Sequence, residues 1–258
     1  MRPTAAAWLI AVALALPARG ASRELRVAAA ADLRFALEEL AAELSRAQPG
    51  SALKISYGSS GTFFAQLSSR APFDVFLSAD ADYPRRLAAE GLGLDAPFVY
   101  AFGRLVLFVG RASPLDVERE GLRALLSPAA RRIAIANPRH APYGRAAEAA
   151  LRAAGLHDAV APRLVLGENV AQTAQFVQSG AADAGLIALS LALAPQMKGG
   201  RFVELPPDSY PRIEQGGLLL SWAREPEAAR AFRDALLGEP GRATLARFGF
   251  WLPGEATK

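Results

Sequence analysis

The chain of 258 residues contains no cysteine and only two histidines, His140 and His157. The lack of cysteine excludes disulfide bonds, zinc–cysteine sites, iron–sulfur clusters and a cysteine nucleophile. Two histidines are too few for a multi-histidine metal cluster. Hydrophobic residues make up 52% of the chain and charged residues 21%. This composition is that of a globular protein, because disordered chains have fewer apolar residues and more net charge.

Long hydrophobic runs are also scarce, and the one that occurs covers residues 5–16, after Arg2. Pro17 ends the run, and Ala18 and Gly20 place small residues at the positions that a signal peptidase reads. This order is typical of a secretory signal peptide, and the run is too short to span a bilayer. We therefore expect residues 1–20 to be a signal peptide that is cleaved after Gly20.

The chain after this segment is predicted to be an exported, soluble protein of a periplasm. Because it has no cysteine, we expect no lipid anchor at its new N-terminus. Loss of residues 1–20 removes Arg2 and Arg19 and no acidic residue, so the formal charge falls from +4 to +2. A nearly balanced charge gives no indication of a nucleic-acid partner or of attachment to an anionic membrane.

Short apolar runs alternate with helical patterns along the rest of the chain. The predicted strands cover residues 24–31, 52–57, 73–77, 104–109, 132–136, 163–166, 185–188 and 217–222. The predicted helices cover residues 32–45, 83–90, 144–154, 169–179, 227–237 and 243–248, with one further helix that carries Phe63, Phe64 and Leu67. Such alternation is typical of α/β folds, in which helices cover both faces of a mainly parallel sheet.

The alternation starts again at residue 104, after a stretch with Gly and Pro at 91–103, which predicts two lobes. We expect residues 21–103 and 208–258 to form lobe I and residues 104–207 to form lobe II. The chain then crosses between the lobes twice, which makes a two-segment hinge. The cleft between two such lobes is the default ligand site.

Four turns from strand to helix carry the residues with binding chemistry: Ala31-Asp32, 58–61 (GSSG), 138–144 (PRHAPYG) and 167–170 (GENV). Each turn brings small or polar residues to a helix N-terminus, where main-chain N–H groups are unpaired and the helix dipole is positive. Such ends bind anions. Any one of these turns alone is most simply an ordinary helix cap.

The segments VAAAADLRFAL, YGSSGTFFAQL, APFDVFLSAD, NPRHAPYG, GENVAQTAQFV and GLIALS occur in this order. Together they resemble the periplasmic molybdate-binding proteins of ABC importers, and the resemblance extends from Arg26 to Phe250. It implies a type II periplasmic-binding fold that closes on molybdate or tungstate and delivers it to a membrane permease. Neutral hydroxyl and main-chain N–H donors hold the anion in that family, so we expect no cofactor and no direct protein ligand to the metal.

The resemblance assigns the oxyanion to four positions of this chain: Asp32, Ser60, Tyr143 and the main chain of Val170. Possible secondary contacts are Ala31, Ser59, Gly61 and Asn169. The chain departs from the family at two places. Ala188 stands where some members have a tyrosine, and Tyr143 could supply that hydroxyl from the opposite wall. Asp32 stands where Ser or Asn is usual, and an ionised carboxylate donates no hydrogen bond and repels an anion.

Three interpretations of Asp32 are open. The side chain could cap its own helix while the main-chain N–H faces the ligand. It could accept a hydrogen from a partly protonated oxyanion such as phosphate or arsenate, which would move specificity away from molybdate. It could itself be protonated in the closed site. Phosphate or arsenate therefore remains an alternative ligand.

Other function classes fit the sequence less well. The GSSGT segment at 58–62 lacks the lysine of a nucleotide-binding loop, and the G-x-S-x-G spacing of serine hydrolases is absent. We therefore expect a monomeric binding protein and not an enzyme, with a ligand-sensing module for a membrane receptor as the alternative. His140 and Arg34 are expected to be solvated or structural.

Overall fold

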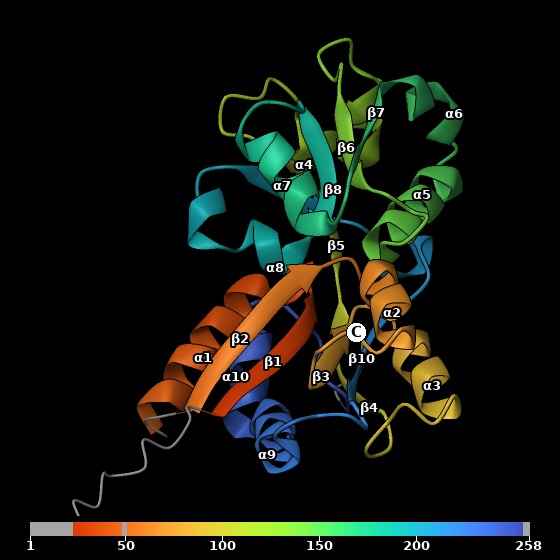
Figure 1. Cartoon of the computed structure of the whole chain (residues 1–258). Helices are drawn as coiled ribbons and strands as arrows, with labels where there is room; N and C mark the ends of the chain where they lie inside the picture. The colour runs from red at the N-terminus through yellow and green to blue at the C-terminus, as the bar shows by residue number, and fades with distance from the viewer. Residues whose placement is uncertain (1–22, 48–50, 255–258) are drawn as a thin grey trace, which may run out of the picture.

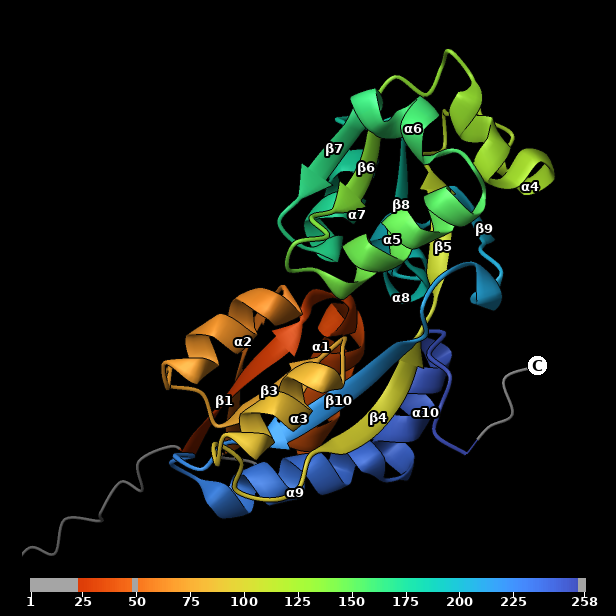
Figure 2. The same cartoon turned by 90° about the vertical axis from the view of Figure 1, so that its right-hand side faces the viewer.

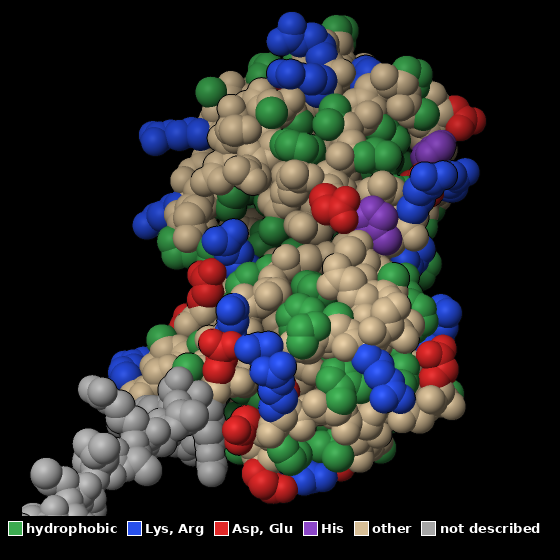
Figure 3. Space-filling view, viewed as in Figure 1, with side chains coloured by type: hydrophobic (Ala, Val, Ile, Leu, Met, Phe, Trp, Pro, Cys, Tyr) green, Lys and Arg blue, Asp and Glu red, His purple; other side chains and the backbone are tan. Residues whose placement is uncertain are grey.

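A computed structural model describes residues 23–47 and 51–254 as two lobes, one above the other in Figures 1 and 2. The predicted signal peptide, residues 1–20, lies outside the described residues. Within the described part of the chain, none of the helices has the length and apolarity needed to cross a membrane. The face in Figure 3 shows basic side chains interspersed with acidic ones.

The described strands form two five-stranded sheets. The strands are β1 (Arg23–Ala30), β2 (Ser51–Gly58), β3 (Val75–Ser78), β4 (Phe98–Gly103), β5 (Leu105–Val109), β6 (Ile133–Ala136), β7 (Leu164–Gly167), β8 (Ala184–Ala188), β9 (Arg201–Glu204) and β10 (Ile213–Leu219).

Helices pack on both faces of these sheets (Figure 2). The α-helices are α1 (Arg34–Ala47), α2 (Ser60–Ser68), α3 (Asp82–Ala89), α4 (Val117–Glu120), α5 (Pro142–Ala153), α6 (His157–Val160), α7 (Val170–Gln178), α8 (Leu189–Ala192), α9 (Pro226–Leu237) and α10 (Glu239–Arg247). The 3₁₀ helices are η1 (Ala31–Leu33), η2 (Gly121–Leu126), η3 (Ala161–Arg163), η4 (Pro195–Met197) and η5 (Pro207–Ser209).

The sheet of the lower lobe has the order β2-β1-β3-β10-β4. Strands β2, β1 and β3 are parallel, and the register places Val27 beside both Ile55 and Val75. Strand β10 returns from the C-terminal part of the chain and pairs antiparallel with both β3 and β4. Residues far apart in the sequence therefore meet in one sheet.

The sheet of the upper lobe repeats this plan in the order β7-β6-β8-β5-β9. Strands β7, β6 and β8 are parallel, while β5 pairs antiparallel with β8 and β9. The three inner strands β6, β8 and β5 are buried along their whole length, because helices cover the two faces of the sheet. The carboxyl ends of the parallel strands of both lobes point toward the junction between the lobes (Figure 2).

The expectation of a two-lobed α/β fold is confirmed. Four strands of each sheet run in the same direction and one, β10 or β5, runs the opposite way, so both sheets are mainly parallel, as expected. Strands β4 and β9 fall in stretches for which the sequence predicted none, and β10 begins at Ile213 instead of at residue 217. The chain passes between the sheets at Arg104 and again over residues 205–212. The lobe limits 21–103, 104–207 and 208–258, and the hinge, stay predictions.

Candidate functional site

Residues of both lobes line a small cavity of about 10 Å³ where the lobes meet. This volume lies far below the roughly 300–1,000 Å³ of pockets for organic ligands. The lining residues are Ala30, Ala31, Asp32, Gly58, Ser59, Ser60, Ala79, Ala141, Pro142, Tyr143, Asn169 and Val170. They include all four predicted anion contacts and three of the four secondary ones. The fourth, Gly61, lies just outside.

Three α-helices begin at this cavity. Helix α2 has Ser59 as its N-cap and Ser60 as its first residue. Helix α5 has Ala141 as its N-cap and Pro142 as its first residue, and Val170 is the first residue of α7. Helix α2 comes from the lower lobe and helices α5 and α7 from the upper one (Figure 1). The positive ends of three helix dipoles therefore converge on one small space, and no Lys, Arg or His is among its lining residues.

The hydroxyl of Ser60 keeps its proton free for a ligand. Ser60 Oγ accepts a hydrogen bond from the main-chain N–H of Ala79 at 2.9 Å, and the residue is buried. A hydroxyl has one donor and two acceptor positions, so this contact orients Ser60 without using its donor. The neighbouring Ser59 Oγ instead donates to the main-chain oxygen of His140 at 2.5 Å.

The opening of α7 presents a main-chain donor. Asn169 caps this helix, and its Oδ1 accepts the N–H groups of Ala171 and Gln172, each at 3.0 Å. The cap leaves the N–H of Val170, the first residue of the helix, at the cavity wall. The side chain of Asn169 is therefore used by the helix cap, while the main-chain N–H of Val170 lies at the cavity.

Asp32 lies in η1, directly after β1, and only 1% of its surface is exposed. Its Oδ2 accepts hydrogen bonds from Tyr143 Oη at 3.0 Å and from Gln215 Nε2. Its Oδ1 is buried and has no partner in the part of the chain that the structure describes. The main-chain N–H groups of Asp32 and Leu33 also form hydrogen bonds with this carboxyl that lower its pKa, so the first interpretation, in which the side chain caps its own helix, stays open.

Burial raises the pKa of the Asp32 carboxyl from its ordinary 3.8 to about 6, although the hydrogen bonds from Gln215 and Tyr143 act in the opposite direction. Burial, and then the charge of Asp32, also raises the pKa of Tyr143 and of Tyr100 well above 10. Both tyrosines therefore remain neutral donors near Asp32. Two unit charges about 4 Å apart repel by about 4 kcal/mol at an effective dielectric constant near 20, so an ionised Asp32 opposes a bound dianion.

Tyr143 belongs to a buried polar network that joins the lobes. Its hydroxyl donates to Asp32, so in this arrangement it does not point a free proton at the cavity. Gln215 on β10 donates to Asp32 and accepts from Tyr100 Oη at 2.9 Å. Ser190 on α8 donates to the main-chain oxygen of Asp32 at 2.7 Å. Asp32 is therefore held from the lower lobe through Gln215 and from the upper lobe through Tyr143 and Ser190.

Comparison with known proteins gives the family. The family model described as bacterial extracellular solute-binding protein matches residues 25–251. The molybdate-binding protein ModA of Rhodobacter capsulatus is 34% identical over 251 residues, which cover 97% of this chain and 96% of that protein. The chain belongs to the bacterial extracellular solute-binding proteins.

Further relatives agree with this family. ModA of Azotobacter vinelandii is 35% identical over 231 residues, which cover 89% of this chain and 90% of that protein. The solved structure of the periplasmic molybdate-binding protein of the same organism matches with a TM-score of 0.83 and covers 89% of this chain and 99% of that one. Membership of a solute-binding family agrees with the expectation that the chain binds a ligand and is not an enzyme.

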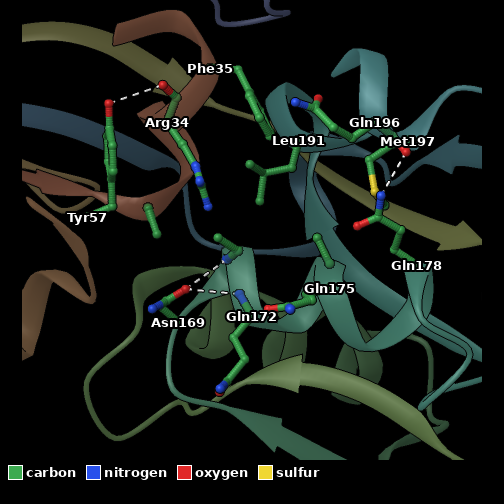
Figure 4. Close-up of a pocket in the computed structure, with 13 residues that line it drawn as sticks. Arg34, Phe35, Tyr57, Asn169, Gln172, Gln175, Gln178, Leu191, Gln196 and Met197 are labelled. Carbon is green, nitrogen blue, oxygen red and sulfur yellow. Dashed lines mark hydrogen bonds between the residues drawn. The ribbon is translucent and has the colours of Figure 1, made fainter. Parts of the chain in front are cut away.

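A second, larger cavity of about 460 Å³ adjoins the first and shares Ala31 and Asn169 with it (Figure 4). Arg34 reaches into this space from α1, opposite the glutamines of α7. The polar groups here are largely engaged with protein partners: Arg34 pairs with Glu38, and Gln178 donates to the main-chain oxygen of Gln196. First-turn residues of α1 and α7 line this space, whereas three α-helices begin at the smaller cavity, which no Lys, Arg or His lines. The smaller cavity is therefore the better candidate for the anion of this solute-binding protein.

Sequence reasoning missed three residues of the site: Gln215, Tyr100 and Ser190. Gln215 is fully buried in β10, between Glu214 and Gly216, and a buried amide within a strand is a signal that could have indicated a role. His140, expected to be solvated or structural, contacts the other lobe. Its main-chain oxygen accepts the N–H of Gly61 at 2.9 Å, and its Nδ1 lies 3.0 Å from Ser59 Oγ.

Proposed function

We propose that this chain is a periplasmic solute-binding protein that captures molybdate or tungstate between its lobes and delivers it to the permease of an ABC importer. Relatives of 34% and 35% identity over nearly the whole chain carry the name molybdate-binding protein, which supports the ligand. We further propose that the exported protein acts as a monomer without a lipid anchor, since the sequence has no cysteine to carry one.

One observation carries the anion proposal: α2, α5 and α7 all begin at one small cavity that no cationic side chain lines. Uncharged donors at helix N-termini suit a small oxyanion whose charge is spread over several oxygens. We assign the anion to the hydroxyl of Ser60, the main chain of Val170 and the carboxyl group of Asp32, with Tyr143 at the cavity wall, where its hydroxyl donates to Asp32. Ala31, Ser59 and Asn169 line the walls around the anion, and Gly61 follows them in the first turn of α2.

The proposed mechanism is closure of the lobes on the anion. Ser60 and Asp32 belong to the lower lobe, whereas Tyr143 and Val170 belong to the upper lobe. An anion that contacts both lobes favours the closed form, because a ligand shifts an equilibrium only through its differential affinity for the two states. The closed form then presents a joint surface to the permease. Fixed hydrogen-bond donors also select by size, so the smaller sulfate would leave gaps.

A thermal-shift panel on residues 21–258 tests this function, with molybdate, tungstate, sulfate, phosphate, arsenate and chromate at neutral pH. A ligand at about 1,000 times its dissociation constant adds about 4 kcal/mol to the free energy of unfolding. For a chain of this size that raises the melting temperature by roughly 8–16 °C. We expect this shift with molybdate and tungstate. No shift with any of the six anions would refute an oxyanion site.

A further inference from the structure

A carboxylate oxygen without a partner lies at the proposed anion site. Asp32 Oδ1 is buried and accepts no hydrogen bond from the described residues, although Asp32 lines the cavity. A buried polar atom without a partner is rare in folded proteins and calls for an explanation such as a ligand or a proton. This oxygen is the one unusual feature of a site that otherwise consists of hydrogen-bond donors.

The other oxygen of Asp32 is already in use. Oδ2 accepts from Tyr143 and from Gln215, and Ser190 holds the main-chain oxygen of the same residue. These three contacts fix the orientation of the carboxyl group. A proton that arrives from solvent therefore bonds to Oδ1, because two donors occupy Oδ2. A carboxyl group protonated in this way gains one O–H donor.

No cation in contact with Asp32 offsets its charge among the described residues. Arg34 pairs with Glu38, and Arg145 pairs with Asp80. Gln215 of β10 and Ser190 of α8 are neutral neighbours of Asp32. The titratable side chains on the elements around it include those of Tyr57, Tyr100 and Tyr143 together with Glu24, Arg26, Glu38, Lys54, Arg145, Glu148 and Glu214. Burial raises the pKa of each of these three tyrosines above its ordinary value of 10, so all three stay uncharged.

We propose that this anion site is linked to a proton: when a divalent oxyanion binds, Asp32 takes up one proton from solvent at Oδ1, and the new O–H donates to a ligand oxygen. This inference rests on the proposed function and specifies how the same site accepts its ligand. An ionised Asp32 places a negative charge beside the anion, whereas the neutral form removes the repulsion and adds a donor. The protein then binds a fully deprotonated anion such as molybdate, and the hydrogen of the bond between Asp32 and the anion is carried by Asp32 and not by the ligand.

The pKa of about 6 for Asp32 in the unliganded protein sets the pH range of this linkage. Below that value the carboxyl group is already neutral, so binding needs no further proton. Above it, each unit of pH lowers the neutral fraction tenfold, and the dissociation constant rises by the same factor. If binding requires the neutral carboxyl group, molybdate affinity at pH 8 is therefore roughly 100-fold lower than at a pH well below 6.

Isothermal titration calorimetry of molybdate into residues 21–258, between pH 5 and pH 8.5, tests the proposal. Micromolar concentrations keep molybdate monomeric, and buffers with different ionisation enthalpies give the number of protons taken up. We expect close to one proton at pH 8 and almost none at pH 5. In Asp32→Asn, one amide oxygen can still accept from Tyr143 and Gln215 while the nitrogen donates to the anion. This variant should take up no proton and bind more tightly than the wild type at pH 8.

Three further variants separate Asp32 from other causes. His140→Gln replaces the imidazole that lies beside Ser59. Asp158→Asn removes a fully exposed carboxylate outside the cavity as a matched control. Both should keep the uptake of one proton. Asp32→Ser provides a second neutral donor should the asparagine variant fail to fold.

The outcomes distinguish the inference from the function on which it rests. Molybdate binding by the wild type at pH 8 without proton uptake overturns the proton link and leaves the function intact. Uptake that persists in Asp32→Asn but is lost in His140→Gln also overturns it. A preference for phosphate or arsenate with no uptake means that the hydrogen arrives on the ligand, which contradicts the proposal. No binding of any oxyanion by the wild type or by Asp32→Asn refutes the proposed function itself.

Discussion

Ser60 accepts from Ala79 and keeps its own proton, which makes it the hydroxyl donor with the clearest role at the cavity. We predict that Ser60→Ala weakens molybdate binding roughly 10- to 150-fold, because a hydrogen bond to a charged group contributes about 1.5–3 kcal/mol. Calorimetric titration measures this change. Ser68→Ala, at the exposed end of the same helix, is the control and should bind as the wild type does. Equal affinity of the two variants would exclude Ser60 from the site.

Asp32 also affects folding without a ligand. Its pKa in the folded protein, about 6, exceeds the ordinary 3.8, so the folded state binds the proton more tightly than the unfolded state. Stability from this group is therefore fully present below pH 3.8 and is lost as the pH rises to about 6. At pH 7 the ionised group destabilises the fold by about 3 kcal/mol.

We predict that Asp32→Asn raises the free energy of unfolding at pH 7 by about 3 kcal/mol, because the amide is neutral at every pH. Urea unfolding of both proteins between pH 4 and pH 8 measures the difference. It should be small near pH 4, grow up to about pH 6 and stay constant above that. If the difference in the free energy of unfolding between the two proteins did not change with pH, burial would not destabilise the ionised form of Asp32.

The sequence predicted most of the residues around the cavity but not the contacts of Asp32. The four turns follow strands and precede helices, so local pattern and family resemblance were enough to bring Ser60, Tyr143 and Val170 to one place. Gln215 lies 183 residues from Asp32 in the chain. Its contact depends on how β10 enters the lower sheet, and no local pattern encodes that pairing.

At the scale of elements, the inner strands of both sheets were predicted better than the edge strands β4 and β9. Strand–helix–strand units show a local alternation of apolar runs and helical patterns, which identifies β1, β2 and β3 directly. Strand β4 lies in a stretch with Gly and Pro, and β9 is a short, partly exposed strand. Both are stabilised by pairing with strands that are distant in the sequence, a tertiary effect that overrides weak local propensity.

The first turn of α2 packs closely against the loop before α5. The main-chain N–H of Gly61 donates to His140 across the lobes, and a Cβ atom at Gly61 would lie 2.7 Å from the main-chain oxygen of His140. The main-chain oxygen of His140 cannot move aside as the end of a flexible side chain can. A side chain at this position therefore separates the lobes although alanine itself favours the helix.

We predict that Gly61→Ala weakens molybdate binding roughly 5- to 150-fold, since close overpacking costs about 1–3 kcal/mol. Helix α2 should remain intact, so the circular dichroism spectrum should not change. Gln66→Ala, on the exposed side of the same helix, should bind normally. Wild-type affinity in Gly61→Ala would show that the contact between α2 and His140 is not needed for ligand binding.

The two lobes of the whole molecule contact each other through several separate interactions around the cavity. Asp32 bonds Tyr143, Gly61 bonds His140, and Arg145 pairs with Asp80. All of these contacts join residues of different lobes, and the chain connects the lobes through two short segments. Such an arrangement permits an equilibrium between separated and contacting lobes, with the ligand bound in the contacting form.

We predict that molybdate reduces the radius of gyration of residues 21–258 in small-angle X-ray scattering. Because hydration of the same polar groups competes with the contacts between the lobes, we expect the separated form to be populated without ligand. A dianion that bonds Ser60 on one lobe and Val170 on the other favours the contacting form in proportion to its affinity difference for the two states. Gly61→Ala, in which a methyl group meets His140, should compact less at the same saturation with molybdate. An unchanged radius for the wild type under full saturation would mean that the anion binds to lobes already held together, and the hinge would then have no role in capture.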